Sequence, residues 1–180
     1  TPEIMIGAIA RMLEGLGHIA VGASSPIPGS AALLARALSG GRTRVSLLGS
    51  EEHNPFTDGG KELFDCAAQG RIDAFFLSGG QIDGRGNINL VGLGPHDRPK
   101  VRFPGSFGSA YLYHLIPRVI LFREEHTPRT LVEKVDFYAV VEEDELVNGR
   151  LHPQLKIVGI GIEESASDEF GTPLLDLSAF

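Results

Sequence analysis

Cysteine and basic residues are scarce in this chain. Its 180 residues include one cysteine, Cys66, which excludes an internal disulfide framework and a multi-cysteine metal site. A single thiol is typical of proteins of the reducing cytoplasm, where we expect this chain to act. The 16 lysines and arginines are outnumbered by 23 aspartates and glutamates, which gives a net charge of -7. This balance argues against nucleic acid as a partner, because binding phosphate backbones requires a basic face.

Long apolar runs and several well-known catalytic motifs are also absent. No apolar run approaches the roughly eighteen residues of a membrane-spanning helix, so no membrane association is expected. The sequence lacks a G-x-S-x-G nucleophile elbow, a P-loop with its lysine and an H-E-x-x-H pair. The six histidines are scattered and fit structural or surface roles better than metal binding. We therefore expect neither a metal nor a permanently bound cofactor.

The sequence has the composition of one folded domain spanning residues 1–180. Hydrophobic residues make up 42% and charged residues 22%, which is normal for a globular protein. Apolar residues at helical spacing alternate with short apolar runs, and this alternation predicts an α/β fold with a mainly parallel sheet covered on both faces. The predicted helices span 2–16, 30–38 and 61–69, and the predicted strands span 19–22, 45–48, 72–77, 119–122 and 135–140. After about residue 141 the pattern weakens to an acidic run at 142–145, predicted to be solvated, and an edge strand at 156–162.

Ligands of such sheets bind outside the carboxyl ends of the strands, so the loops that follow strands are candidate sites. Glu51 follows the strand 45–48 and is a candidate nucleophile or base, with a solvated turn as the alternative. Residues 78–109 are rich in glycine and follow a buried strand. Their backbone amides could bind a thioester carbonyl or a phosphate, or the segment could form tight turns stabilised by Asp and Asn. The candidate binding residues of this segment are Gly79, Gly80, Gln81, Asn87, Gly105, Ser106 and Gly108.

A short basic stretch precedes the last of these glycines. Lys100 and Arg102 lie at alternate positions with Arg98, which puts them on one face if the segment is extended. They are candidate contacts for a nucleotide phosphate, and a solvated strand face is the alternative.

Four segments together resemble a known family. The sequences GGQID at 79–83, GNIN at 86–89, PKVRFPGS at 99–106 and KVDF at 134–137 are similar to those of B (beta) subunits of family I coenzyme A transferases, especially the glutaconate type. The resemblance extends from the first helix to Asp136, about three quarters of the chain. It implies a three-layer α/β/α sandwich and a hetero-oligomer with an alpha subunit. Acyl-CoA and a carboxylic acid would be the substrates, with coenzyme A consumed rather than permanently bound.

The same resemblance implies that Glu51 forms a glutamyl-CoA intermediate, while the glycine-rich loop stabilises the oxyanion. Family members usually continue after this glutamate with Asn-Gly, whereas Glu52, His53 and Asn54 follow here. A shift of one or two residues would put Gly49 at the nucleophile position and remove the covalent route. Acyl-CoA hydrolysis, decarboxylation and a non-catalytic CoA-binding role therefore remain alternatives to CoA transfer.

Overall fold

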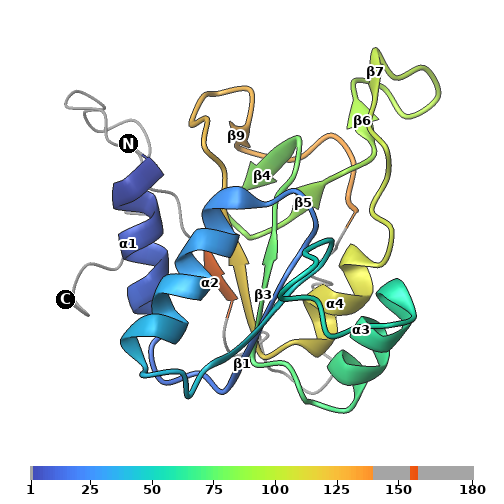
Figure 1. The fold of residues 1–180 in the computed structure, drawn as a ribbon. Helices are drawn as coiled ribbons and strands as arrows, with labels where there is room; N and C mark the ends of the chain where they lie inside the picture. Colours follow the sequence, from blue (N-terminus) through green and yellow to red (C-terminus); the bar gives the residue numbers. More distant parts are fainter. Residues whose placement is uncertain (1, 140–154, 158–180) are drawn as a thin grey trace, which may run out of the picture.

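The computed structural model describes residues 2–139 and 155–157 (Figure 1). Its main sheet has the strand order β10-β8-β3-β1-β2, and all four neighbouring pairs are parallel. These strands are β1 His18–Val21, β2 Arg44–Leu47, β3 Ala74–Leu77, β8 Arg118–Leu121 and β10 Leu155–Ile157. The helices are α1 Pro2–Met12, α2 Pro26–Leu38, α3 Gly59–Ala68 and α4 Ser109–Leu115.

The strands are buried from both sides, which explains why they read as continuous apolar runs. Alternate strand residues such as Ile19 and Phe76 belong to one core cluster with α1 and α2, while Ala20 and Phe75 belong to a second cluster with α3 and α4. Figure 1 shows the two helix pairs on opposite faces of the sheet. The predicted three-layer α/β/α architecture is confirmed.

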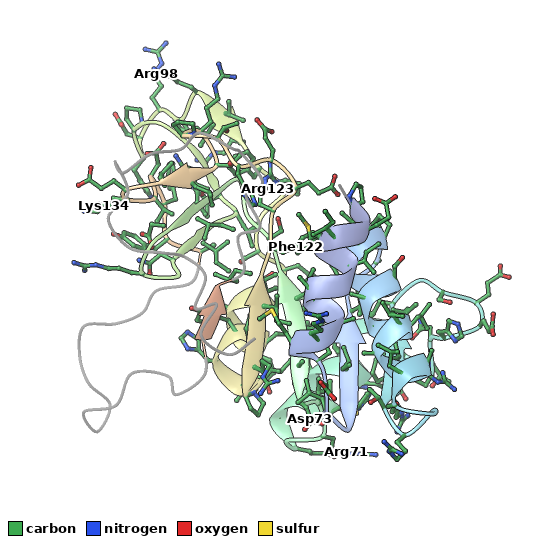
Figure 2. All side chains as sticks on the ribbon, turned by 90° about the vertical axis from the view of Figure 1, so that its left-hand side faces the viewer. Arg71, Asp73, Arg98, Phe122, Arg123 and Lys134 are labelled. Atoms are coloured by element: carbon green, nitrogen blue, oxygen red, sulfur yellow. The ribbon has the colours of Figure 1, made fainter. Side chains whose placement is uncertain are left out.

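A smaller sheet covers the carboxyl end of the main sheet. It has the order β5-β4-β9, with β4 Gln81–Asp83 antiparallel to β5 Ile88–Asn89 and parallel to β9 Leu131–Val132. A separate hairpin of β6 Gly92–Leu93 and β7 Val101–Arg102 projects beyond it (Figure 1). Figure 2 shows Arg98 and Lys134 in this upper part, Phe122 at its junction with the main sheet, and Arg71 and Asp73 at the opposite end.

Several predicted boundaries were wrong. Helix α1 ends at Met12 rather than 16, and the turn that follows contains Gly15 in the left-handed region at φ 77°. Helix α2 begins at Pro26 rather than 30, because a proline fits the first turn of a helix, where its missing N–H costs no bond.

The segment 135–139 is not a strand, although Val135 and Phe137 are buried, and the nearby strand is β9. Helix α4 and the strands β4 to β7 were not predicted. The predicted edge strand is confirmed in part by β10, and residues 158–162 and the acidic run 142–145 lie outside the described residues. No helix in the described part of the chain is long and apolar enough to cross a membrane.

Candidate functional site

The strand order places a topological switch point between β1 and β3. From β1 the chain proceeds to β2 on one side, and it later returns to β3 on the other. Connections that leave in opposite directions open a crevice outside the carboxyl ends of the two strands, and ligands of open α/β sheets bind there. The loops at this edge are 22–25 after β1, 48–53 after β2 and 78–80 after β3.

The loop after β1 leads directly into the amino end of α2. Ser24 has a left-handed backbone with φ 56°, which is uncommon for a residue other than glycine. Ser25 is the N-cap of α2, yet its hydroxyl donates to the carbonyl of Ala23 at 3.3 Å instead of accepting from the helix amides. The positive end of this thirteen-residue helix is therefore not neutralised by its cap and favours negative charge beside the loop.

Glu51 lies in a tight turn beyond β2. The amide of His53 donates to the hydroxyl of Ser50 at 3.0 Å, and its carbonyl accepts from the amide of Leu47 at 3.0 Å. These bonds fold the segment back on the end of β2. The Glu51 side chain is exposed and has no hydrogen-bond or ion-pair partner among the described residues, whereas Glu52 lies 3.8 Å from the His53 ring.

Gly49 faces the neighbouring loop at the same edge. Its φ is 81°, and a Cβ at this position would lie 3.5 Å from the Cβ of Ala23 in the loop after β1. A side chain at position 49 would thus point toward the crevice rim, while Glu51 is two residues farther along the exposed turn. The structure does not bring Glu51 into contact with the glycine-rich segment.

Gly79 and Gly80 allow strands to approach each other closely. A Cβ on Gly79 would overlap Ile88, and a Cβ on Gly80 would overlap the ring of Phe103. The Gly80 amide donates to the carbonyl of Asn89 at 2.9 Å, so this amide is already used within the protein.

Two buried polar networks hold the β4–β5 hairpin. The side-chain oxygen of Gln81 accepts from Asn89 Nδ2 at 2.6 Å and from the Asp136 amide at 2.9 Å. Asp83 accepts from the Asn87 amide at 3.0 Å and from Asn87 Nδ2 at 2.9 Å. These interactions correspond to the predicted alternative of a turn stabilised by Asp and Asn. Contact of Gln81 or Asn87 with a ligand stays a prediction.

The loop before α4 has an unusual backbone. Gly105, Phe107 and Gly108 have φ values of 99°, 43° and 91°, and the Phe107 side chain is 84% exposed. The Ser106 carbonyl accepts from the Ser109 amide at 2.7 Å, whereas the amides of residues 106, 107 and 108 have no acceptor among the described residues. Phe107 lies within the predicted glycine-rich segment but was not among the candidate binding residues, because its exposure and its positive φ leave no signal in the sequence.

Lys100 and Arg102 lie on the projecting β6–β7 hairpin. The Lys100 side chain covers Gly94, whose Cβ position is 3.3 Å from the lysine Cγ, and Arg102 is exposed. Neither cation forms an ion pair within the described residues. Both are accessible to an anion, and their predicted contact with a phosphate stays a prediction.

His18 and Ser46 form a buried pair that links β1 to β2. The Nε2 atom of His18 is 2.8 Å from Ser46 Oγ, and Nδ1 is 2.8 Å from the carbonyl oxygen of Arg71. Burial lowers the pKa of His18 below its ordinary value of 6.5, and the cations of Arg44 and Arg71 lower it further. Because Ser46 is fully buried, we interpret this pair as structural rather than as a nucleophile with its base.

Comparisons with known proteins give one consistent result. The family model described as "Coenzyme A transferase" matches residues 1–171. The chain is 37% identical over 102 residues to the B subunit of the 3-oxoadipate CoA-transferase of Pseudomonas knackmussii, and 34% identical over 62 residues to the B subunit of the glutaconate CoA-transferase of Acidaminococcus fermentans. These alignments cover 56% and 34% of this chain but only 38% and 23% of the two relatives.

Solved structures give the same fold. The decarboxylase AibA/AibB is similar with a TM-score of 0.68 and 26% identity, over 78% of this chain and 66% of that one. The glutaconate coenzyme A-transferase of Acidaminococcus fermentans is similar with a TM-score of 0.63 and 18% identity, over 78% of this chain and 61% of that one. The second likeness is evidence for the fold alone.

Proposed function

Because the chain belongs to the coenzyme A transferase family, we propose that it is the B-type half of a two-subunit enzyme that moves CoA from an acyl-CoA to a carboxylic acid. The match to two B subunits of CoA-transferases carries the proposal. The partner is an A-type subunit, in keeping with the paired name of the AibA/AibB structure. That subunit would complete the crevice at the switch point.

In the proposed mechanism Glu51 is the nucleophile. Its carboxylate attacks the thioester carbonyl, CoA leaves as the thiolate, and an acyl-glutamyl anhydride forms. The thiolate then attacks the glutamyl carbonyl and displaces the first carboxylate, which leaves a glutamyl-CoA thioester. The acceptor carboxylate attacks that thioester, and CoA leaves as the thiolate, which gives a second anhydride. The thiolate then attacks the acceptor's carbonyl in this anhydride, which yields the second acyl-CoA and releases the Glu51 carboxylate. The Glu51 carboxylate is exposed and has no partner among the described residues, which supports this role because none of them has to be displaced.

The proposed oxyanion and CoA contacts come from the loops around the crevice. The amides of Ser106 and Gly108, which have no acceptor among the described residues, suit an oxyanion or a phosphate oxygen. The Gly105 amide donates to the carbonyl of Leu90 at 3.1 Å, so Gly105 would contribute through the shape of the loop. The β4–β5 hairpin would contribute indirectly, because its shape would determine the surface that the ligand meets. This shape is held by Gly79, Gly80, Gln81 and Asn87. Lys100 and Arg102 would meet the CoA phosphates.

One observation favours a second candidate, acyl-CoA hydrolysis or decarboxylation. Gly49 faces the loop after β1, so this position at the crevice rim carries no carboxylate. A structure 26% identical to this chain is named a decarboxylase. In that case the chain would bind the thioester, and no glutamyl intermediate would form.

The test is to trap the intermediate in the co-purified two-subunit complex. The complex is incubated with a panel of acyl-CoAs, treated with borohydride and digested for mass spectrometry. CoA transfer predicts reduction or a CoA adduct at Glu51, which Glu51→Gln abolishes. Glu52→Gln is the matched control, because Glu52 is an exposed carboxylate of the same turn, and this variant should retain the adduct and the activity.

The remaining outcomes separate the candidates. Thioester consumption that needs no acceptor acid, leaves residue 51 unmodified and persists in Glu51→Gln supports hydrolysis or decarboxylation. Release of CO2 distinguishes the latter. Turnover that is unaffected by every substitution in this chain would overturn both proposals in favour of a non-catalytic subunit.

A further inference from the structure

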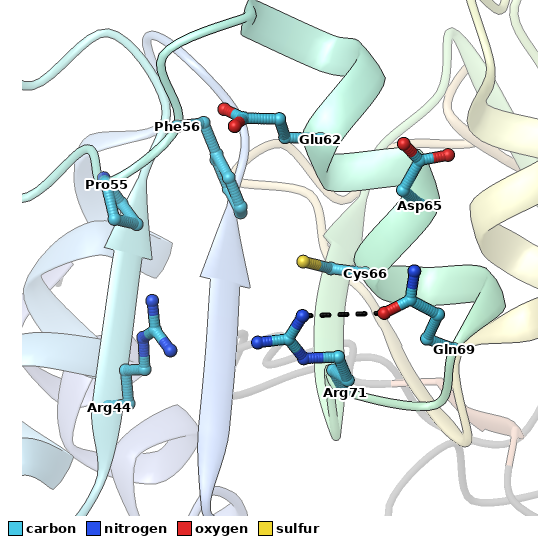
Figure 3. A pocket seen from close by; sticks show the side chains of 8 residues that line it. All are labelled: Arg44, Pro55, Phe56, Glu62, Asp65, Cys66, Gln69 and Arg71. Carbon is cyan, nitrogen blue, oxygen red and sulfur yellow. Dashed lines mark hydrogen bonds between the residues drawn. The ribbon is translucent and has the colours of Figure 1, made fainter.

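Two arginines face a hollow that lies away from the crevice. The hollow has a volume of about 270 Å³ and is situated between β2 and α3, on the side of the amino ends of the strands. Figure 3 shows Arg44 rising from β2 and Arg71 reaching in from the start of β3, with the Phe56 ring and the Cys66 sulfur above them. A second hollow of about 160 Å³ adjoins it at Arg44 and Pro55, and its lining adds Arg36 together with Glu52 and His53 of the Glu51 turn.

The arginines have no acidic partner within the described residues. Two ion pairs occur there, Glu52 with His53 and Asp58 with Lys61, and neither involves an arginine of the hollow. Within the described part of the chain, the one hydrogen bond of the Arg71 side chain is a long one of 3.4 Å to the side-chain oxygen of Gln69. Glu62 and Asp65 line the same hollow, so what distinguishes it is two guanidinium groups without an ion pair among the described residues, not an excess of charge.

The nearby carboxylates are engaged elsewhere. Asp73 Oδ2 accepts from the amides of Gly17 and His18 at 2.7 and 2.8 Å. Glu62 accepts from the amides of Thr57 and Asp58. Asp65 lines the hollow, but in Figure 3 its carboxylate is directed away from both guanidinium groups. The site thus offers guanidinium donors that no carboxylate of the lining pairs with, beside the apolar surface of Phe56.

We propose that the hollow lined by Arg44 and Arg71 binds a phosphate or diphosphate group of a small molecule. Planar guanidinium groups bind phosphate oxygens in a bidentate manner, and two of them match a doubly charged anion. Binding at the two arginines does not depend on the proposed transfer reaction, because Arg44 begins β2 and Arg71 precedes β3, whereas Glu51 follows the carboxyl end of β2. Its ligand is a free phosphate compound or the nucleotide end of CoA, and both share this chemistry.

The sole cysteine provides a readout at the site itself. The full chain, co-purified with its partner subunit, is titrated with inorganic pyrophosphate by calorimetry. In parallel, the rate of Cys66 modification by neutral iodoacetamide is measured from its peptide by mass spectrometry. At ten times Kd, a bound anion should slow this modification about tenfold. Sodium chloride at matched ionic strength should leave the rate unchanged.

Arginine variants test the assignment. Arg44→Gln and Arg71→Gln should each weaken pyrophosphate binding about tenfold, because each removes a charge-assisted contact. Both side chains are exposed, so the fold should persist, as circular dichroism would verify. Arg129→Gln is the matched control, since Arg129 is an exposed arginine just before β9 in the smaller sheet and does not line the hollow, and it should change neither measurement.

Adenosine 3′,5′-bisphosphate distinguishes the two sources. Stronger protection by this compound than by pyrophosphate assigns the site to the CoA nucleotide, and equal protection assigns it to free phosphate compounds. The proposal is overturned if neither compound binds, or if protection of Cys66 survives in both arginine variants. Activity is not a readout here, so failure of the transfer mechanism would leave this result interpretable.

Discussion

Replacement of Gly79 by alanine should destabilise the protein without removing any functional group. A Cβ at this position would overlap the Cγ2 atom of Ile88 and lie 2.8 Å from the carbonyl oxygen of Gln81 and 3.2 Å from that of Asn89. Ile88 is fully buried, and the two carbonyls belong to paired strands. None of the three neighbours is the free end of a flexible side chain, so the backbone has to move.

The expected cost follows from overpacking, which amounts to about 1–3 kcal/mol, and the rigid neighbours place Gly79→Ala toward the upper end of that range. The lower conformational entropy of the unfolded alanine chain recovers about 0.4–1 kcal/mol. A net loss of about 2 kcal/mol corresponds to a decrease in Tm of roughly 4–8 °C for a chain of this size. Thermal unfolding followed by circular dichroism measures this change.

Gly84→Ala is the matched control, because Gly84 lies in the same hairpin and its Cβ would meet no atom within 4 Å. It should be neutral or slightly stabilising. If Gly79→Ala is as stable as Gly84→Ala, the packing argument is refuted. A stable but inactive Gly79→Ala would instead indicate that the loop approaches the ligand directly.

Three further predictions concern the polar interactions that frame the two ends of the sheet. Burial lowers the pKa of His18 in the folded chain below 6.5, so the unfolded chain takes up the proton first and the unfolding free energy should decrease from pH 7 toward pH 5. This group contributes at most about 1.4 kcal/mol per pH unit. His18→Gln should weaken this pH dependence of the unfolding free energy, measured by urea unfolding at several pH values. Asp73→Ala leaves two backbone amides without their acceptor and should cost about 1–3 kcal/mol in the same urea assay, with unchanged stability counting against the capping role. Gln81→Met removes the acceptor that is shared by Asn89 and the Asp136 amide and should cost a similar amount, and retained protection of the Asp136 amide in hydrogen exchange would contradict this.

The sequence was most informative where hydrophobic burial decides the structure. The apolar runs that contain Val45 and Phe75 predicted their strands to within about two residues, and their alternation with helices predicted a parallel sheet. Strands β4 to β7 were missed because each has only two or three residues, too few for a period to be recognised. They are held instead by contacts distant in sequence, such as the bond of 2.8 Å between the Ile82 amide and the Thr130 carbonyl.

The candidate site was predictable in part. The motif around Gly79 indicated where the backbone is most constrained. The sequence did not show which atoms of this segment face a ligand, and the chemistry of the segment depends on those atoms. The sequence could not reveal that Ile88 and Phe103 fill the space beside the two glycines. Nor could it distinguish Arg44 and Arg71 from ordinary surface cations, because their lack of an ion pair among the described residues is a property of the folded neighbourhood.

The turn after β2 restricts where a covalent intermediate can form. Gly49 occupies the left-handed region at φ 81°, where any other residue costs roughly 1–2 kcal/mol, so this turn is shaped for glycine at the position facing Ala23. The carboxylates that follow β2 within the turn are Glu51 and Glu52, and Glu52 lies beside His53. In the proposed transfer mechanism we therefore expect the glutamyl-CoA thioester at residue 51, whose carboxylate has no ion-pair partner among the described residues. Activity that survives Glu51→Gln would require the reaction to proceed without a nucleophile from this turn, which is the condition that hydrolysis or decarboxylation would meet.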